Sequence, residues 1–110
     1  MERFSWVSPR DIPEQFDLRR KGWELLPLKS PQSDNVVLVD ANSLNDQRFL
    51  QFITMASAEN RRMMLVCGAE TPEVRSRLLS GGLGDAVAHT VAMEELEARA
   101  SKLDALANWV

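Results

Sequence analysis

The sequence predicts an α/β domain that is built on a parallel β-sheet with helices on both faces. Short apolar runs such as Val36–Val39 alternate along the chain with segments whose apolar residues recur at helical spacing. Strands that are apolar throughout are typical of parallel sheets, because the helices that connect the strands cover both faces. The 110 residues are enough for one domain with its own core.

The first half of the chain predicts three strands and two helices. Gly22 ends the first helix as a C-terminal glycine, and Pro27 places the second strand at an edge of the sheet. Ser43 caps the second helix, with Asp46 three residues later. The expected elements, in order, are a strand at Arg3–Val7, a helix at Asp11–Arg20, a strand at Trp23–Leu28, a polar loop at Lys29–Asn35, a strand at Val36–Val39 and a helix from Ser43 to about Ala58.

The second half predicts two further strands, each followed by a helix. Thr71-Pro72 opens one helix with a hydroxyl cap and a proline in the first turn. Its expected packing residues are Val74, Leu78 and Leu79. The expected elements are a strand at Met63–Cys67, a helix from Thr71 to Gly81, a strand at Asp85–His89 and a helix at Ala92–Asn108, whose inward face is Met93, Leu96, Ala100, Leu103 and Leu106.

Composition excludes several classes of protein. The net charge of −3 argues against a surface that binds nucleic acid directly. Cys67 is the only cysteine, which excludes an intrachain disulfide and a cysteine metal cluster. No apolar run is long enough to span a membrane, and the N-terminus lacks the apolar stretch of a signal peptide, so we expect a cytoplasmic protein. The sequence contains neither of the glycine-rich motifs that bind nucleotides, Gly-x-Gly-x-x-Gly and Gly-x-x-x-x-Gly-Lys-Ser/Thr.

Asp40 is the first candidate site residue, because it ends an apolar strand at the edge where ligands gather in open α/β sheets. Two later runs end at the same edge, at Cys67 and near His89. One interpretation is structural, with Asp40 as a loop cap, Cys67 as a buried hydrophobic residue and His89 at the surface. The second makes Asp40 a phospho-acceptor, and the third is an Asp-His-Cys nucleophilic constellation of a cysteine-dependent enzyme.

The stretch from Val36 to Leu103 resembles the second half of a response-regulator receiver domain. The matching segments are Val36–Asp40, Met63–Gly68, Gly82–Thr90 and Glu94–Leu96. The first half matches more loosely. The resemblance implies a flavodoxin-like fold with three layers and the strand order 2-1-3-4-5. It also implies that Asp40 stands at the phospho-accepting position.

Several positions depart from the pattern of that family. Ser8-Pro9 replace the two acids that hold a magnesium ion, Cys67 replaces a hydroxyl residue, His89 replaces the lysine and Ala86 replaces the aromatic switch residue. Phosphoryl transfer depends on charge neutralisation and positioning, so we expect the magnesium site and most of the reactivity of Asp40 to be lost. The family's helix between the second and third strands is also missing or reduced to the loop at Lys29–Asn35, leaving Trp23 buried or exposed on a thinly covered face.

The sequence therefore predicts that residues 1–110 form one atypical receiver domain of a bacterial two-component system. We expect it to be no enzyme, to need no cofactor or phosphorylation, and to act through dimerisation or a protein partner. The alternatives are a receiver that uses Asp40 for phosphorelay signal transduction and, more distantly, a cysteine-dependent enzyme. The last helix is expected to lead into an output domain, which by resemblance is a DNA-binding domain, a cyclic-di-GMP enzyme or an ATPase. The expected interface residues are Arg75, Arg77, Glu94, Glu95, Arg99, Leu106 and Trp109.

Overall fold

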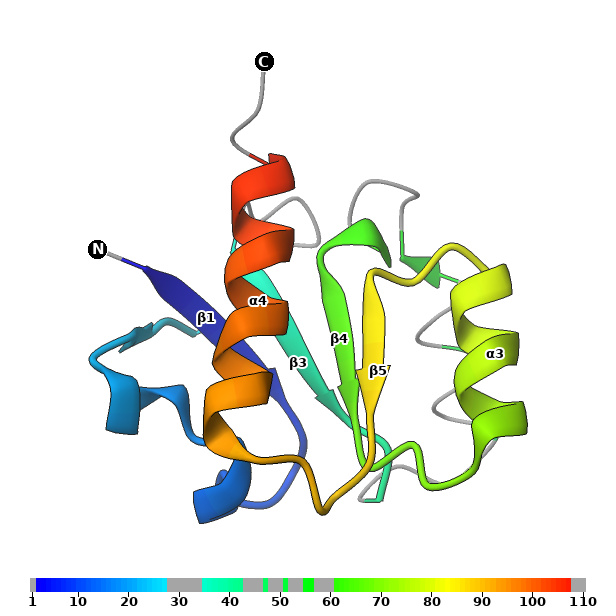
Figure 1. Ribbon diagram of the computed structural model, residues 1–110, viewed down its shortest axis with the longest axis horizontal. Helices are drawn as coiled ribbons and strands as arrows, with labels where there is room; N and C mark the ends of the chain where they lie inside the picture. The colour runs from blue at the N-terminus through cyan, green and yellow to red at the C-terminus, as the bar shows by residue number, and fades with distance from the viewer. Residues whose placement is uncertain are drawn as a thin grey trace.

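Five parallel strands form one sheet in the order β2-β1-β3-β4-β5 in a computed structural model of the chain (Figure 1). The strands are β1 (Arg3–Val7), β2 (Glu24–Leu25), β3 (Val36–Asp40), β4 (Met64–Cys67) and β5 (Asp85–Val87). The structure describes residues 2–27, 35–42, 47, 51, 55–56 and 61–107, without the side chains of 106 and 107. The α/β class, the parallel sheet and the predicted strand order are confirmed.

The register of the sheet brings the carboxyl ends of its central strands together at one end of the sheet, which we call the carboxyl edge. Val7 of β1 pairs with Val39 of β3, so Ser8 follows beside Asp40. Asp40 itself pairs with Cys67 of β4, and Cys67 pairs with Val87 of β5. This edge lies at the bottom of Figure 1, opposite the two chain termini.

Alternating residues of the strands feed two separate apolar clusters, one on each face of the sheet. Leu38 and Leu65 belong to one cluster, while the next residues, Val39 and Val66, belong to the other. This alternation follows from the two-residue period of a strand. The first cluster contains Phe4, Phe16, Leu18, Trp23, Leu96, Ala100 and Leu103, and the second contains Val37, Ala56, Met64, Leu78, Leu83 and Ala86.

The two described α-helices supply residues to opposite faces. Helix α4 (Met93–Ala107) packs Leu96, Ala100 and Leu103 into the first cluster, as the helical spacing predicts. Helix α3 (Pro72–Ser80) packs Leu78 into the second cluster and lies beside β5 (Figure 1). The Oγ of Thr71 accepts a hydrogen bond from the backbone N–H of Val74 at 3.2 Å, which confirms the predicted cap.

The predicted helix at Asp11–Arg20 is wrong. The segment forms two short 3-10 helices, η1 (Glu14–Phe16) and η2 (Leu18–Lys21). Asp17 between them has an extended backbone, and its carboxylate accepts from the N–H of Arg19 at 3.1 Å. An aspartate that bonds to nearby backbone competes with helix continuation, so it starts a new turn instead. Gly22 ends η2 with φ of 84°, as predicted.

The second and fifth strands are shorter than predicted. The N–H of Trp23 donates to the carbonyl of Leu18 and closes η2, so β2 begins only at Glu24. Strand β5 ends at Val87, and His89 lies in the turn beyond it. Trp23 is buried in the first cluster, where its ring meets Phe4 edge to face at 6.4 Å. Of the two alternatives for Trp23, the buried one is correct.

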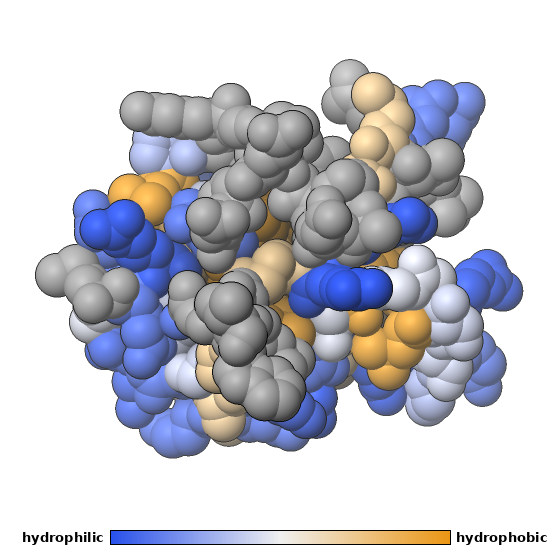
Figure 2. Space-filling view, turned by 90° about the horizontal axis from the view of Figure 1, so that it is seen from above, coloured by the Kyte–Doolittle hydropathy of each residue, from blue (hydrophilic) through white to orange (hydrophobic). Residues whose placement is uncertain are grey.

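Two of the three predicted packing residues of α3 face outward. Val74 is 40% exposed and Leu79 is 47% exposed, while Leu78 is buried. Helix α3 lies at the β5 side of the sheet, so the sheet covers only a narrow stripe of it. Outside the grey atoms, the face seen in Figure 2 is largely hydrophilic, with small apolar patches.

Some predictions fall outside the described residues. These are the loop at Lys29–Asn35 apart from Asn35, the helix from Ser43 to Ala58 apart from residues 47, 51, 55 and 56, the side chain of Leu106, and residues 108–110 with Trp109. Among the residues that are described, no helix has the length and apolar character needed to cross a membrane.

Candidate functional site at the carboxyl ends of the strands

Asp40 is a completely buried carboxylate at the last position of β3. Side chains two residues apart in a strand point to the same face of the sheet, so Asp40 points to the same face as Val36 and Leu38, the face that α4 covers. A buried carboxylate is costly unless hydrogen bonds and an opposite charge compensate it. The neighbours of Asp40 therefore decide what this residue can do.

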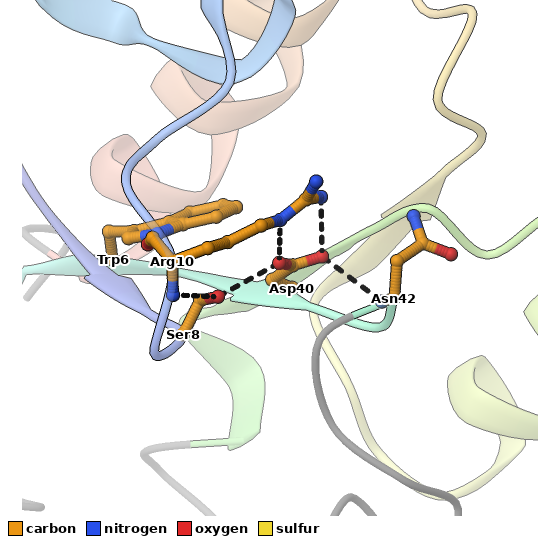
Figure 3. Close-up of polar contacts among 5 residues, drawn as sticks. All are labelled: Trp6, Ser8, Arg10, Asp40 and Asn42. Carbon is orange, nitrogen blue, oxygen red and sulfur yellow. Dashed lines mark hydrogen bonds and ion pairs between the residues drawn. The ribbon is translucent and has the colours of Figure 1, made fainter.

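In the part of the chain that the structure describes, Arg10, Ser8 and Asn42 donate hydrogen bonds to the two oxygens of Asp40 (Figure 3). The guanidinium of Arg10 spans both oxygens, with Nε on Oδ2 and Nη2 on Oδ1 at 3.1 Å. Ser8 Oγ donates to Oδ2 at 2.9 Å, and the backbone N–H of Asn42 donates to Oδ1 at 3.0 Å. This fork geometry is the strongest form of an arginine–carboxylate pair.

Arg10 is held in place by the loop that follows β1. Its backbone N–H donates to Ser8 Oγ at 3.2 Å, and its carbonyl accepts from Trp6 Nε1 at 3.0 Å. The hydrogen bond to Asp40 raises the pKa of Arg10 above its ordinary value. The guanidinium is thus a fixed positive charge beside Asp40. The Ser8 hydroxyl bonds to both residues, because it donates to Asp40 and accepts from the backbone N–H of Arg10.

Sequence reasoning did not identify Arg10 as a site residue. The only available signal was a cation within two residues of Ser8, at the end of a strand that neighbours the strand of Asp40. Because arginine is common on protein surfaces, that spacing alone does not indicate an ion pair. The parallel register of β1 and β3 makes the pair possible.

Cys67 lies next to Asp40 in the sheet but points into the apolar core. Its side chain belongs to the cluster of Leu65 and Leu96 and is fully buried. Burial raises the pKa of the Cys67 thiol well above its ordinary value, and the negative charge of Asp40 adds to this. A thiol in this environment carries almost no thiolate at neutral pH, and thiolate is the nucleophilic form.

His89 bonds to Glu70 on the loop that follows β4. Its backbone N–H donates to Glu70 Oε1 at 3.0 Å, and its ring Nδ1 lies 2.7 Å from Oε2. The hydrogen bond from His89 is the largest cause that lowers the pKa of Glu70. The structure thus brings Ser8 to Asp40, whereas it pairs His89 with a residue that the sequence analysis did not single out.

Asn42 and Gly68 make a close contact at the same edge. A Cβ atom on Gly68 would lie 2.3 Å from Nδ2 of Asn42, and Gly68 has φ of 95°. The positive φ favours glycine at this position, whereas the amide of Asn42 could turn away from a Cβ atom. The segments that follow β3 and β4 therefore touch at Asn42 and Gly68.

Most of the charged residues predicted for an interface bond within the chain. Arg99 Nη1 donates to both carboxylate oxygens of Asp85, at 2.9 and 3.0 Å, and Arg99 Nη2 donates to Glu95. Glu94 pairs with Lys21, and Arg75 donates to the carbonyl of Ala69 at 2.7 Å. Arg77 is exposed on α3, Ala86 is buried in β5 and Pro9 is exposed in the loop.

The described part of the chain contains no group of three or more His, Cys, Asp or Glu residues that could hold a metal ion. Among the described residues, the Ser8 hydroxyl and the Arg10 guanidinium donate to Asp40, and neither is a carboxylate ligand for a hard cation. What this arrangement does chemically is to neutralise Asp40 and to saturate its oxygens.

A comparison with models of known protein families found no match to this chain, and a comparison with curated proteins found none either.

Proposed function

We propose that this chain is a degenerate receiver domain, a module of bacterial cytoplasmic signal transduction that works by binding and without phosphorylation. The strand order β2-β1-β3-β4-β5, which flavodoxin-like folds share, supports this proposal. The position of Asp40 at the end of the central strand agrees with the sequence resemblance. The observation that carries the proposal is the clamp on Asp40 by Arg10, Ser8 and the Asn42 amide.

The clamp argues for binding rather than phosphoryl transfer. A phospho-accepting carboxylate attacks through a free oxygen lone pair while a metal ion neutralises the incoming charge. Here the guanidinium of Arg10 stands against both oxygens, where a second cation would be repelled. The residues beside Asp40 therefore do not fit the magnesium ion that the receiver family uses.

The decisive test is NMR with a phosphoryl analogue. We expect the backbone signals of Ala41 and Asn42 to stay unshifted when beryllofluoride and magnesium are added together, relative to magnesium alone. The physical reason is that Arg10 and Ser8 already occupy the oxygens of Asp40.

The Asp40→Asn variant is the matched control for this experiment. Saturable shifts at Ala41 and Asn42 that disappear in Asp40→Asn would establish the alternative, a phospho-accepting receiver that uses Asp40. Acetyl phosphate with magnesium, read by intact mass, gives an independent check of the same alternative.

The proposed binding surface is formed by α3, β5 and α4. Arg99 ties α4 to β5 through Asp85, and α3 also contacts β5, so β5 lies next to both helices. Leu79 adds exposed apolar area on α3, one turn from Arg75 on the same side of the helix. Apolar contacts with charged surroundings are typical of protein interfaces, and the occupant that we propose is a second copy of the chain.

Light scattering over a concentration series tests the homodimer. We expect Leu79→Glu to weaken association by about tenfold or more, because it places a charge in the apolar part of the surface. Ser80→Glu is the matched control, since it adds the same charge at the neighbouring exposed position of α3. Monomer masses for all three proteins at every concentration would exclude the homodimer and leave the partner protein.

A further inference from the structure

A single hydrogen-bonded pair connects the segments that lead into α3 and α4. Glu70 directly precedes Thr71, the cap of α3. His89 lies in the turn that leads to α4, where the N–H of Val91 donates to the carbonyl of Ala88. Residues 19 apart in sequence are thus joined through both oxygens of one carboxylate, at 3.0 and 2.7 Å. We call this pair the Glu70–His89 clasp.

We propose that the Glu70–His89 clasp is a proton-sensitive tie that sets how the starts of α3 and α4 stand relative to each other. The clasp itself does not depend on the proposed function, and the inference rests on that function only in assuming that the surface formed by these helices binds a partner. His89 is the only histidine of the chain. Imidazole is the side chain that takes up a proton between pH 5 and 8, so no other side chain of ordinary behaviour responds in that range.

The sign of the pH response follows from the two partners. The bond to His89 lowers the pKa of Glu70. The ionised carboxylate of Glu70 therefore contributes its full stabilisation at pH values above the ordinary pKa range of a glutamate, and this stabilisation is lost as the pH falls through the lowered pKa. Above that point, a charged imidazole gives an ion pair, and a neutral imidazole gives only a hydrogen bond. The clasp is therefore tighter with a protonated imidazole than with a neutral one.

The backbone and most of the charged groups around Glu70 and His89 are bonded separately from this pair. The backbone beneath it is fixed, because the N–H groups of Gly68 and Ala69 both donate to the carbonyl of Val87 at 2.9 Å. His89 is 56% exposed and Glu70 is 42% exposed, so solvent protons reach both. Among the described residues, the charged groups on α3 are Arg75, which attracts Glu70, and the exposed acid Glu73. Asp40 of β3 is held by Arg10, and Glu94 and Glu95 of α4 pair with Lys21 and Arg99.

Hydrogen exchange of the His89 amide, followed by NMR, tests the clasp in the isolated chain. After correction for the intrinsic exchange rate, we expect this amide to exchange about two- to fivefold more slowly at pH 5.5 than at pH 7.5, as suits a partly exposed ion pair. The amide signals of Thr71 and Val91 should move over the same range. Glu70→Gln should remove both effects, since glutamine keeps the shape and loses the charge.

Glu73→Gln is the matched control, because Glu73 is an exposed acid in the first turn of α3. It should leave the pH response unchanged. An equal response in the natural protein and in Glu70→Gln would overturn the proposal. Because the measurement needs no partner, the clasp can fail while the proposed binding function stands, and the reverse outcome is equally visible.

Discussion

Replacing Arg10 with methionine is expected to lower the free energy of unfolding by about 2 to 3 kcal/mol at pH 7. The change leaves the buried carboxylate of Asp40 without its counter-charge, and breaking a buried pair in this way costs about 3 to 5 kcal/mol. We discount that figure because the side chain of Arg10 is 45% exposed, so water can reach part of the vacated space. Urea denaturation at pH 7 measures the loss.

Two further variants separate charge from packing at this pair. Arg10→Lys keeps the charge but not the two-pronged bond, and should therefore lose part of the stability. The double variant Arg10→Met with Asp40→Asn should recover part of the loss, because no buried charge remains. Arg19→Met is the control, since Arg19 forms a similar two-pronged pair with Asp17 at the surface. If Arg10→Met costs no more than Arg19→Met, the clamp on Asp40 contributes nothing to stability.

Replacing Gly84 with alanine is expected to cost about 2 to 3 kcal/mol in the same assay, the upper part of the range for overpacking a tight site. A Cβ atom at Gly84 would lie 2.2 Å from the carbonyl oxygen of Arg62 and 2.8 Å from Cδ2 of Leu103. The side chain of Leu103 can turn away, but the carbonyl of Arg62 belongs to the backbone that leads into β4. The N–H of Gly84 also donates to the carbonyl of Arg61 at 2.9 Å, which fixes this close approach.

Gly81→Ala is the matched control for this prediction. A Cβ atom there would meet the carbonyl oxygens of Leu78 at 3.4 Å and Arg77 at 3.5 Å, and the backbone has φ of −80°, which alanine adopts without strain. We expect a change within about 1 kcal/mol. Similar losses for the two alanine variants would show that the approach of Gly84 to Arg62 is not tight in solution.

The strands and the helix caps were predictable because their signals are local. The apolar run before Asp40 and the Thr71-Pro72 pair each specify an element through neighbouring residues, and β3 and α3 lie where these residues indicate. The segment of Asp17 misled the prediction because its side chain offers the backbone a competing bond. A periodic pattern of apolar residues does not reveal that competition.

The site was only partly predictable, since its partners are distant in sequence. The position of Asp40 follows from its strand, but its bond with Arg10 spans 30 residues and depends on the register of β1 and β3. The same holds for Glu70 and His89, which are 19 residues apart. Cys67 was correctly placed at the end of β4, and the direction of its side chain followed from the parity of the strand once the covered face was known.

The bond between Asp85 and Arg99 also has a consequence for assembly. The carbonyl of Val87 faces β4, so the N–H of the preceding residue, Ala86, faces the open edge of the sheet. The carboxylate of Asp85 accepts from that N–H at 2.8 Å, and Arg99 holds the carboxylate in place. An edge whose outward amide is already bonded is a poor template for strand addition, so this contact protects the chain against fibril-like stacking through β5.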